Sequence, residues 1–255
     1  MSRQLYGYLR TESFPTPFCS GCGHGTLMAA LIRAINSLSW DMSEMLFVSG
    51  IGCAGWIPSP HYAADTLHTT HGRPIAFATG AKLFNPRLKV VVIGGDGDIA
   101  SIGGNHLIHA ARRNIDLTVI CANNMIYGMT GGQVAATTPP GAITTTTEAG
   151  NPDRAFDLCR LVEAAGATYV ARSTVYHVVH LVKILKNALQ HRGFAFVEVL
   201  SSCPTHYGRR NGAASPTDML NLYKGLCVGL DSASRDSATV QGKILIGEFV
   251  RGGRA

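Results

Sequence analysis

Short hydrophobic runs alternate with longer amphipathic stretches along most of this chain. The short runs are rich in β-branched residues and stop abruptly at small or polar residues, as buried strands do. The longer stretches repeat apolar residues at intervals of three and four, which is typical of helices with one buried face. We expect strands at residues 46–48, 88–93, 117–122, 168–171 and 194–200. We expect helices at residues 25–38, 103–113, 153–165 and 174–191.

Strands that alternate with helices of ten or more residues predict right-handed βαβ crossovers and parallel strand pairing. The expected fold class is therefore α/β, with a mostly parallel, doubly wound sheet. The 255 residues suffice for one large domain, and 46% hydrophobic with 15% charged residues suit a well-buried globular protein. We assign residues 1–230 to this domain and residues 231–255 to a C-terminal extension or arm. Within the extension, Ser232–Gln241 is expected to be a loop and Ile244–Ile246 a terminal strand or arm.

Two long segments are rich in residues that interrupt regular structure. Residues 50–86 contain many Gly, Pro and His residues and are expected to form a long functional loop, with a helix around Arg73–Lys82. The Gly- and Thr-rich segment 128–151 exceeds the usual length of a connection, which indicates an active-site lid or a partner contact. Residues 1–18 are expected to form an irregular arm, and beyond residue 203 the chain becomes polar.

The net charge is +6, and the basic residues are spread out, with short pairs at Arg112–Arg113 and Arg209–Arg210. Nucleic-acid binding would need a denser basic stripe with interleaved aromatic residues, so we expect no nucleic-acid partner. An anionic cofactor, an acidic substrate or an acidic electron-carrier protein explains this charge equally well. No apolar run approaches the roughly 18 residues that span a membrane, and Met1–Tyr6 lacks an apolar signal core. We therefore expect a cytoplasmic protein with no membrane partner.

Small and polar residues follow two neighbouring predicted strands. Gly95–Asp98 comes directly after one strand, and Asn124 follows the next strand, 28 positions beyond Asp96. Because the carboxyl ends of parallel strands open onto a ligand crevice, these residues are expected to share one site. Gly95 and Gly97 let the backbone approach a ligand, while Asp96 and Asn124 offer oxygen atoms. Such oxygens suit Mg²⁺ that holds a diphosphate, since Mg²⁺ completes its shell with phosphate and water.

The same glycines leave a second interpretation open. Gly95–Ala100 also fits the G-x-G-x-x-A dinucleotide fingerprint, with Asp116 at about the right distance in sequence to bind a ribose. A lone match of this kind is common by chance. An NAD-binding Rossmann oxidoreductase is therefore the enzyme alternative, and it predicts a protein without iron.

The seven cysteines fall into two groups. Three lie in apolar segments and are expected to be inert core residues: Cys121, Cys159 and Cys227. Four have settings typical of metal ligands, with a CxxC pair, a cysteine after a strand and a Cys-Pro: Cys19, Cys22, Cys53 and Cys203. Tetrahedral thiolates suit both zinc and a [4Fe–4S] cluster, and a thioredoxin-like redox pair is a third option. A zinc-stabilised assembly subunit without catalytic activity is the alternative outside enzymology.

Six segments together resemble the β subunit of 2-oxoacid:ferredoxin oxidoreductases, which bind thiamine diphosphate. The resemblance runs from about Phe18 to Gly208, three quarters of the chain. The segments are Cys19–His24, Ile51–Cys53, His71–Arg73, Gly95–Asp98, Asn123–Gln133 and Cys203–Thr205. The resemblance implies a thiamine diphosphate-binding fold of the diphosphate-binding (PP) type, and residues 1–230 would hold both the thiamine and the iron–sulfur cofactor.

By this resemblance, the residues that hold Mg²⁺ are Asp96, the Asn124 side chain and the Ile126 carbonyl. A [4Fe–4S] cluster close to the thiamine is held by Cys19, Cys22, Cys53 and Cys203. Other expected cofactor contacts are Ile51, Gly52, Cys53, His71, Gly95, Gly97, Asp98, Tyr127, Gly128, Met129 and Thr130. His24 is a weaker candidate, because it could simply pack at a helix start.

The resemblance also implies partners. A glutamate must activate the aminopyrimidine ring of the cofactor, but none of the glutamates here lies in a fitting motif. An α subunit is therefore expected to supply the pyrimidine-binding domain and the catalytic glutamate. The chain lacks the clustered cysteine runs of a ferredoxin module. Electrons must therefore leave through another subunit, such as a small γ or δ subunit, or through external ferredoxin.

The implied reaction is the coenzyme A-dependent oxidative decarboxylation of a 2-oxoacid, with electrons passing through the cluster to ferredoxin. Tyr127–Thr130 and Ala165–Arg172 look more like the 2-oxoglutarate subfamily, whereas pyruvate-type relatives tend to carry Asn in place of Met129. Some 2-oxoglutarate members carry Lys in place of Gly131, so a branched-chain 2-oxoacid or pyruvate stays an alternative substrate. Three cations could bind a substrate carboxylate: Arg73, Lys82 and Arg112.

Overall fold

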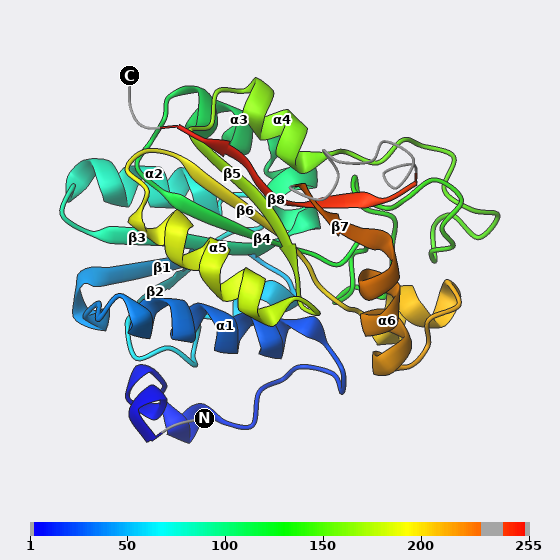
Figure 1. Cartoon of the computed structure of the whole chain (residues 1–255), viewed down its shortest axis with the longest axis horizontal. Coiled ribbons are helices and arrows are strands. Elements are labelled where there is room, and N and C mark those ends of the chain that lie inside the picture. Colours follow the sequence, from blue (N-terminus) through cyan, green and yellow to red (C-terminus); the bar gives the residue numbers. More distant parts are fainter. Residues whose placement is uncertain (1–2, 231–241, 253–255) are drawn as a thin grey trace.

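An eight-stranded sheet forms the centre of the computed structural model, which describes residues 3–230 and 242–252 (Figure 1). The strand order within these residues is β2-β1-β3-β4-β6-β5-β8-β7. The strands are β1 Met45–Ser49, β2 Asp65–His68, β3 Lys89–Gly95, β4 Thr118–Asn123, β5 Tyr169–Thr174, β6 Ala195–Leu200, β7 Cys227–Gly229 and β8 Ile244–Arg251.

The strands from β2 to β5 in this order pair in parallel, while β8 runs antiparallel to β5 and β7 pairs in parallel with β8. Every residue of β4, β5 and β6 is buried, because helices cover both faces of the sheet. The predicted α/β class with a mostly parallel, doubly wound sheet is confirmed. An antiparallel edge strand on such a sheet is common.

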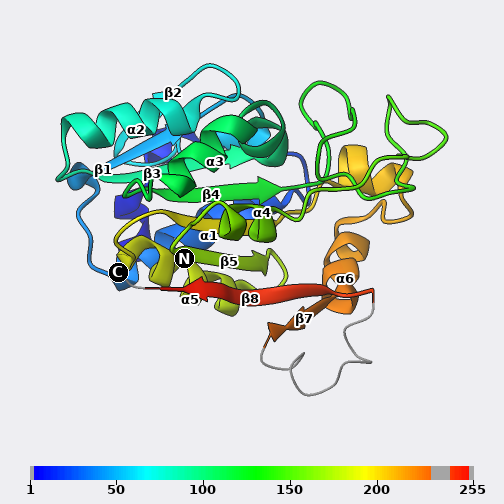
Figure 2. The ribbon, with the colours of Figure 1, turned by 90° about the horizontal axis from the view of Figure 1, so that it is seen from above.

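Two layers of helices cover the sheet (Figures 1 and 2). Helices α1, Gly23–Ser37, and α5, Val178–Gln190, pack against each other on one face. Helices α2, Pro74–Phe84, α3, Gly104–Arg112, and α4, Leu158–Ala164, cover the other face. Each layer encloses its own hydrophobic core with the sheet between them. Among the described residues, no helix is both long and apolar enough to cross a bilayer.

Most predicted elements are present, with shifted ends. All five predicted strands form, the helix expected around Arg73–Lys82 is α2, and the strand expected at Ile244–Ile246 begins β8. The helix predicted at 153–165 begins only at Leu158, because the Asp157 side chain caps it by accepting the backbone N–H of Arg160. A π-helical turn, Gly97–Ile102, precedes α3.

Three of the described helices and strands were not predicted, and β7 at Cys227–Gly229 is one of them. Strand β2 lies within the segment expected to be a loop, and helix α6, Pro216–Leu226, lies in the polar C-terminal part. The predicted loop at Ser232–Gln241 lies outside the described residues. Strand β8 adds residues of the predicted C-terminal extension to the sheet, and the division at residue 230 stays a prediction.

The carboxyl ends of β1, β3, β4 and β6 meet at one edge of the sheet. The long segment 128–151 extends outward from this edge beyond the end of β4, and α6 lies on the same side (Figure 2). This arrangement brings the segments that carry the predicted site residues to one end of the molecule.

Candidate functional site

A cavity of about 100 Å³ lies at the carboxyl ends of β1, β3 and β4, and we call it the glycine-rich cavity. All but one of the residues predicted to contact the cofactor line it: Ile51, Gly52, Cys53, His71, Gly95, Gly97, Asp98, Asn124, Ile126, Tyr127, Gly128, Met129 and Thr130. The exception, Asp96, lies just beneath the wall and is 1% exposed. The structure thus brings these residues together, as the sequence predicted, and their roles stay predictions.

Asp96 is a buried carboxylate without a basic partner among the described residues. One of its oxygens accepts the backbone N–H of Asn124 at 3.4 Å, and the other accepts the hydroxyl of Thr137. Burial raises the pKa of Asp96 to about 6, although these two hydrogen bonds oppose the shift. A bound divalent cation would stabilise the charged carboxylate, so this residue fits the predicted Mg²⁺.

A tight turn presents the other two predicted magnesium ligands. The Asn124 side-chain oxygen accepts the backbone N–H of Ile126 at 3.2 Å. Met125, between them, has a φ of +63°, which is uncommon for a residue with a side chain. Asn124 and Ile126 both line the glycine-rich cavity, and the Asn124 backbone N–H bonds to Asp96 at its edge. This oxygen donor set suits a hard cation.

Asp98 holds the walls of the cavity together. Its Oδ1 atom accepts hydrogen bonds from His71 Nδ1 at 2.7 Å and from the Gly72 backbone at 2.6 Å. Its Oδ2 atom is buried without a partner among the described residues. A Cβ atom on Gly50 or Gly94 would lie 2.2 or 2.7 Å from this oxygen, so both positions require glycine.

Gly97 lies directly against the ring of Tyr127. The Tyr127 hydroxyl donates to the Gly97 carbonyl at 3.2 Å, and a Cβ atom on Gly97 would lie 2.3 Å from the ring. From the sequence, we expected this glycine to make room for a ligand. The structure adds a second reason, since the side chain of Tyr127 already fills the space.

The four candidate cysteine ligands line one second cavity of about 220 Å³, which we call the cysteine cavity: Cys19, Cys22, Cys53 and Cys203. The two cavities adjoin, because both are lined by Cys53, His24, Asn124, Gly128 and Met129. At their border, a Cβ atom on Gly128 would lie 3.7 Å from both the Asn124 amide nitrogen and the Cys203 sulfur. A metal held by these cysteines would therefore lie next to the predicted diphosphate site.

The four cysteine sulfurs are grouped less closely than a tetrahedral zinc site requires. Tetrahedral zinc with its four thiolates would place the sulfurs about 3.8 Å apart. No three of the four cysteine sulfurs come within 4.8 Å of one another, and the one described trio that compact is Asp157, Cys159 and Glu198. The wider spacing suits the larger [4Fe–4S] cluster better than a zinc ion.

Burial also affects the thiols of the cysteine cavity. It raises the pKa of Cys22 to about 12 and raises the pKa of Cys53. A thioredoxin-like pair needs a lowered pKa at only one of its two thiols, so the shift at Cys22 does not test that alternative. Bound metal would supply the positive charge that ionises such buried thiols.

His24 lines both cavities, although the sequence made it only a weak candidate. Its Nδ1 atom lies 3.0 Å from the hydroxyl of Ser201. Burial lowers the pKa of His24 to about 4, so the ring is neutral at pH 7. A neutral imidazole here adds no charge between the two cavities.

Among the described residues, neither cavity is lined by a glutamate, a lysine or an arginine. The glutamates that lie elsewhere are Glu12, Glu44, Glu148, Glu163, Glu198 and Glu248. The three cations considered for a substrate carboxylate are likewise absent from both walls: Arg73, Lys82 and Arg112.

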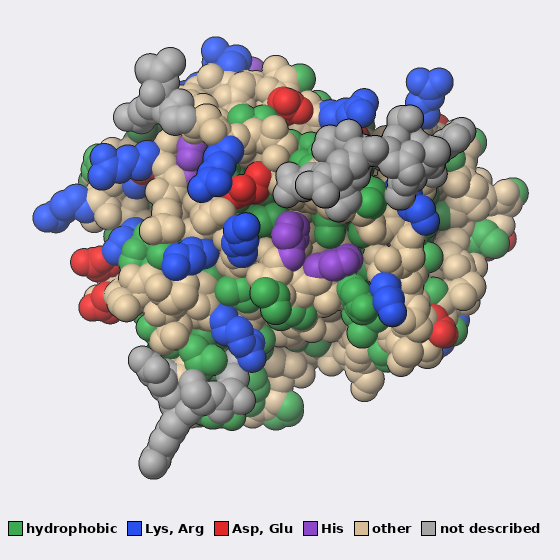
Figure 3. Space-filling view, viewed as in Figure 1, with side chains coloured by type: hydrophobic (Ala, Val, Ile, Leu, Met, Phe, Trp, Pro, Cys, Tyr) green, Lys and Arg blue, Asp and Glu red, His purple; other side chains and the backbone are tan. Residues whose placement is uncertain are grey.

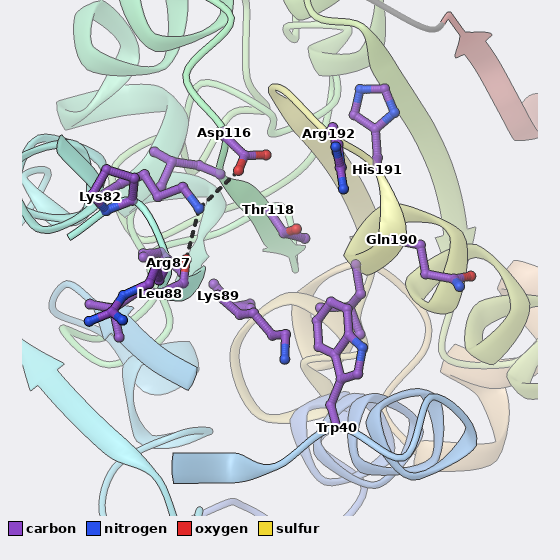
Figure 4. A pocket seen from close by; sticks show the side chains of 15 residues that line it. Trp40, Lys82, Arg87, Leu88, Lys89, Asp116, Thr118, Gln190, His191 and Arg192 are labelled. Carbon is purple, nitrogen blue, oxygen red and sulfur yellow. Dashed lines mark hydrogen bonds and ion pairs between the residues drawn. The ribbon is translucent and has the colours of Figure 1, made fainter. Parts of the chain in front are cut away.

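A further cavity of about 640 Å³ lies at the opposite, amino-terminal edge of the sheet (Figure 4). There Lys82 pairs with Asp116 at 2.9 Å, beside Arg87 and Lys89. Elsewhere, on the described part of the face in Figure 3, Lys and Arg side chains are scattered. Asp116 precedes β4, so it lies at the other end of the sheet from Gly95. It therefore cannot bind the ribose of a dinucleotide whose phosphates contact these glycines, and the NAD alternative is wrong.

The fold and the site define a thiamine diphosphate-binding subunit. Residues 50–199 match the family described as thiamine pyrophosphate enzyme, C-terminal TPP binding domain. The 2-oxoglutarate synthase subunit KorB of Methanocaldococcus jannaschii is 52% identical over 95% of this chain and 90% of that protein. The 2-oxoacid:ferredoxin oxidoreductase subunit beta of Saccharolobus solfataricus is 44% identical over 74% of this chain and 62% of that protein.

One solved structure is similar over nearly the whole chain. The 2-oxoglutarate:ferredoxin oxidoreductase from Magnetococcus marinus, with 2-oxoglutarate, coenzyme A and succinyl-CoA bound, matches with a TM-score of 0.87 and 32% identity. The match covers 98% of this chain and 86% of that one. The chain belongs to the β subunits of the 2-oxoacid:ferredoxin oxidoreductases, as its motifs predicted.

Proposed function

We propose that this chain is the β subunit of a 2-oxoglutarate:ferredoxin oxidoreductase that holds thiamine diphosphate, Mg²⁺ and a [4Fe–4S] cluster. The observation that carries the proposal is the common wall of the two cavities, which brings Asn124 next to Cys203. A cofactor that stabilises a carbanion can pass electrons one at a time to a cluster that lies close to it, and this arrangement provides that proximity.

In this proposal, the predicted site residues have separate tasks. Asp96, the Asn124 side chain and the Ile126 carbonyl hold Mg²⁺ and through it the diphosphate. Asp98 fixes His71 in the wall, while the buried Asp96 is kept from water by Thr137 and the 124–126 turn. The thiols of the cysteine cavity hold the cluster. When bound, thiamine diphosphate supplies the electron sink for decarboxylation and the cluster accepts the electrons.

The chain acts together with partners in this proposal. Within residues 3–230 and 242–252, no glutamate, Lys or Arg lines the walls of the two cavities. This supports an α subunit that supplies the catalytic glutamate and the cation for the substrate carboxylates. Coenzyme A is the acyl acceptor, and ferredoxin, directly or through small γ or δ subunits, is the electron acceptor. A cytoplasmic location belongs to the same proposal.

The substrate is 2-oxoglutarate in this proposal, with branched-chain 2-oxoacids and pyruvate as alternatives. The names of the more similar relatives support this choice, since four proteins at 49% to 52% identity are called 2-oxoglutarate synthase subunits. Relatives named only as 2-oxoacid enzymes are 40% to 44% identical.

The test is anaerobic co-purification of the chain with its α subunit. Coenzyme A-dependent reduction of ferredoxin should then be fastest, at limiting substrate, with 2-oxoglutarate, slower with pyruvate and 3-methyl-2-oxobutanoate, and absent with the β chain alone. Analysis should find about four irons and four sulfides per β chain. Zinc without iron would overturn the electron-transfer half of the proposal, and a preference for another 2-oxoacid would overturn the substrate.

A further inference from the structure

A buried ion pair lies behind the predicted magnesium site. Arg172 on β5 and Glu198 on β6 are register partners in adjacent strands. Arg172 Nε donates to Glu198 Oε2 at 2.6 Å, and the two side chains are 8% and 3% exposed. Charged groups are rarely buried this deep unless they are paired, and even a paired burial costs free energy because both charges leave water. A pair at this position therefore calls for a reason other than stability.

The pair connects to the turn that carries the predicted ligands. Glu198 Oε1 accepts a hydrogen bond from Asn123 Nδ2 at 2.7 Å. The other end of the same amide, Asn123 Oδ1, accepts the backbone N–H of Met125 at 2.9 Å. Both ends of the Asn123 side chain are therefore engaged, and Glu198 determines which end faces the turn.

The turn depends on this hydrogen bond. Met125 has its φ at +63°, a left-handed conformation that a residue with a Cβ adopts only when other contacts hold it. Two contacts do so here: Asn123 Oδ1 accepts its N–H, and the Thr138 hydroxyl donates to its carbonyl at 2.7 Å. The conformation of this turn then determines the directions of the Asn124 side chain and the Ile126 carbonyl.

We propose that Arg172 and Glu198 are positioning residues for the Mg²⁺–diphosphate site and act through Asn123. This inference rests on the proposed function. Arg172 also donates to Asp157 at 2.5 Å and to the Leu245 carbonyl at 3.3 Å, which anchors it from the far side. Its charge balances Glu198, so a strong acceptor holds Asn123 without adding uncompensated negative charge behind Asp96.

The isosteric variant Glu198→Gln separates positioning from simple stabilisation. Arg172 needs an acceptor, so the new amide oxygen faces Arg172 and its NH₂ group faces Asn123. The Asn123 side chain must then flip so that its oxygen accepts this bond. Its NH₂ group now faces the N–H of Met125, and two donors cannot form a hydrogen bond. The turn loses its hydrogen bond although the overall shape is unchanged.

A second substitution should repair this defect. In the double variant Asn123→Asp/Glu198→Gln, one carboxylate oxygen accepts from the new glutamine and the other accepts the Met125 N–H. The net charge of the network is also restored. A control variant on the same strand, Tyr169→Phe, loses a partly buried hydrogen bond to Glu248 at 2.8 Å and a buried one to the Ile184 carbonyl at 3.2 Å. Neither bond has a link to the turn.

The experiment uses the anaerobic αβ complex, stripped of metal with EDTA and titrated with thiamine diphosphate at fixed Mg²⁺. We expect Glu198→Gln to raise the dissociation constant about 10- to 100-fold, as loss of a residue that orients a metal ligand does. The dissociation constant of the double variant should return to within about threefold of the wild-type value. Tyr169→Phe should have the wild-type dissociation constant. Iron content should be the same in all samples.

The alternatives give different results. If Glu198→Gln binds the cofactor like the wild type while its melting temperature falls, the pair is a structural ion pair and the inference is wrong. Arg172→Lys, which keeps the charge but not the guanidinium geometry, provides a second variant should Glu198→Gln give no folded complex. Wild-type affinity in Arg172→Lys would equally overturn the inference. A wild-type complex that binds no thiamine diphosphate would instead overturn the proposed function, and this inference with it.

Discussion

The ring of His71 is held by Asp98, with 2.7 Å between Nδ1 and Oδ1. The same oxygen accepts the backbone N–H groups of Gly72 at 2.6 Å and Ile51 at 3.4 Å. One buried carboxylate after β3 thus joins two distant loops to the end of the sheet. The sequence predicted Asp98 and His71 as separate cofactor contacts, and the structure shows that they form a unit.

Asp98→Asn should destabilise the protein and weaken cofactor binding. The amide nitrogen would take the place of Oδ2, which is buried beside Gly50 and Gly94 without a partner, and an unsatisfied buried donor costs about 1–3 kcal/mol. Thermal unfolding of the anaerobic complex measures this cost. The exposed Asp153→Asn serves as a control and should unfold like the wild type.

Asp96→Asn should affect stability and binding in opposite directions. It replaces a buried carboxylate without a basic partner by a neutral amide, so the melting temperature of the cofactor-free complex should rise. Retention of thiamine diphosphate through Mg²⁺ should fall by about 100-fold or more, because a metal ligand loses its charge.

Equilibrium dialysis against thiamine diphosphate and Mg²⁺ measures that retention. Asp116→Asn, at the opposite edge of the sheet, should bind like the wild type. Full cofactor occupancy in Asp96→Asn would show that this residue is not a magnesium ligand, whatever happens to the melting temperature.

Cys203→Ala should remove the iron–sulfur cluster while leaving diphosphate binding measurable. Cys203 lines the cysteine cavity but not the glycine-rich cavity, whereas Cys53 lines both. Iron and sulfide analysis of the anaerobic variant checks the first part, and cofactor titration checks the second. Cys121→Ala, a buried cysteine within β4, is the matched control and should keep its iron. Unchanged iron in Cys203→Ala would exclude it as a ligand.

Gly97→Ala should destabilise the protein through one identified clash. The new methyl group would lie 2.3 Å from the Tyr127 ring, and overpacking of this kind costs about 1–3 kcal/mol. In the double variant Gly97→Ala/Tyr127→Ala the clash is absent. Its loss of unfolding free energy should therefore be smaller than the sum of the losses in the two single variants. Denaturant unfolding of the four proteins gives the coupling, and strict additivity would show that the ring is not the obstacle.

Buried elements were predictable from their hydrophobic patterns, and exposed ones were not. Strand β4 is buried at every position and follows a continuous apolar run. Strand β2 is an edge strand whose residues are mostly exposed, so no hydrophobic pattern marks it. Helix α6 did leave a local signal: Ser215 and Asp218 form a capping box, with Pro216 at the first helical position.

The site was predictable where neighbours in sequence carry it. Gly95–Asp98 and Asn123–Tyr127 each follow a strand, so parallel pairing alone brings them together. The Thr137 hydroxyl on Asp96 and the link from Asn123 to Glu198 join residues 41 and 75 positions apart. Such contacts depend on loop conformation and on strand register, which motif spacing does not contain.

The sheet ends in short strands on both sides. Strand β2 has four residues and β7 has three, and the longer β8 pairs with β5 and with β7 along different parts of its length. A long, unpaired edge would offer backbone groups to any passing strand and would invite aggregation. Among the described residues, the outermost strands β2 and β7 are both short, so each offers few unpaired backbone groups to another strand.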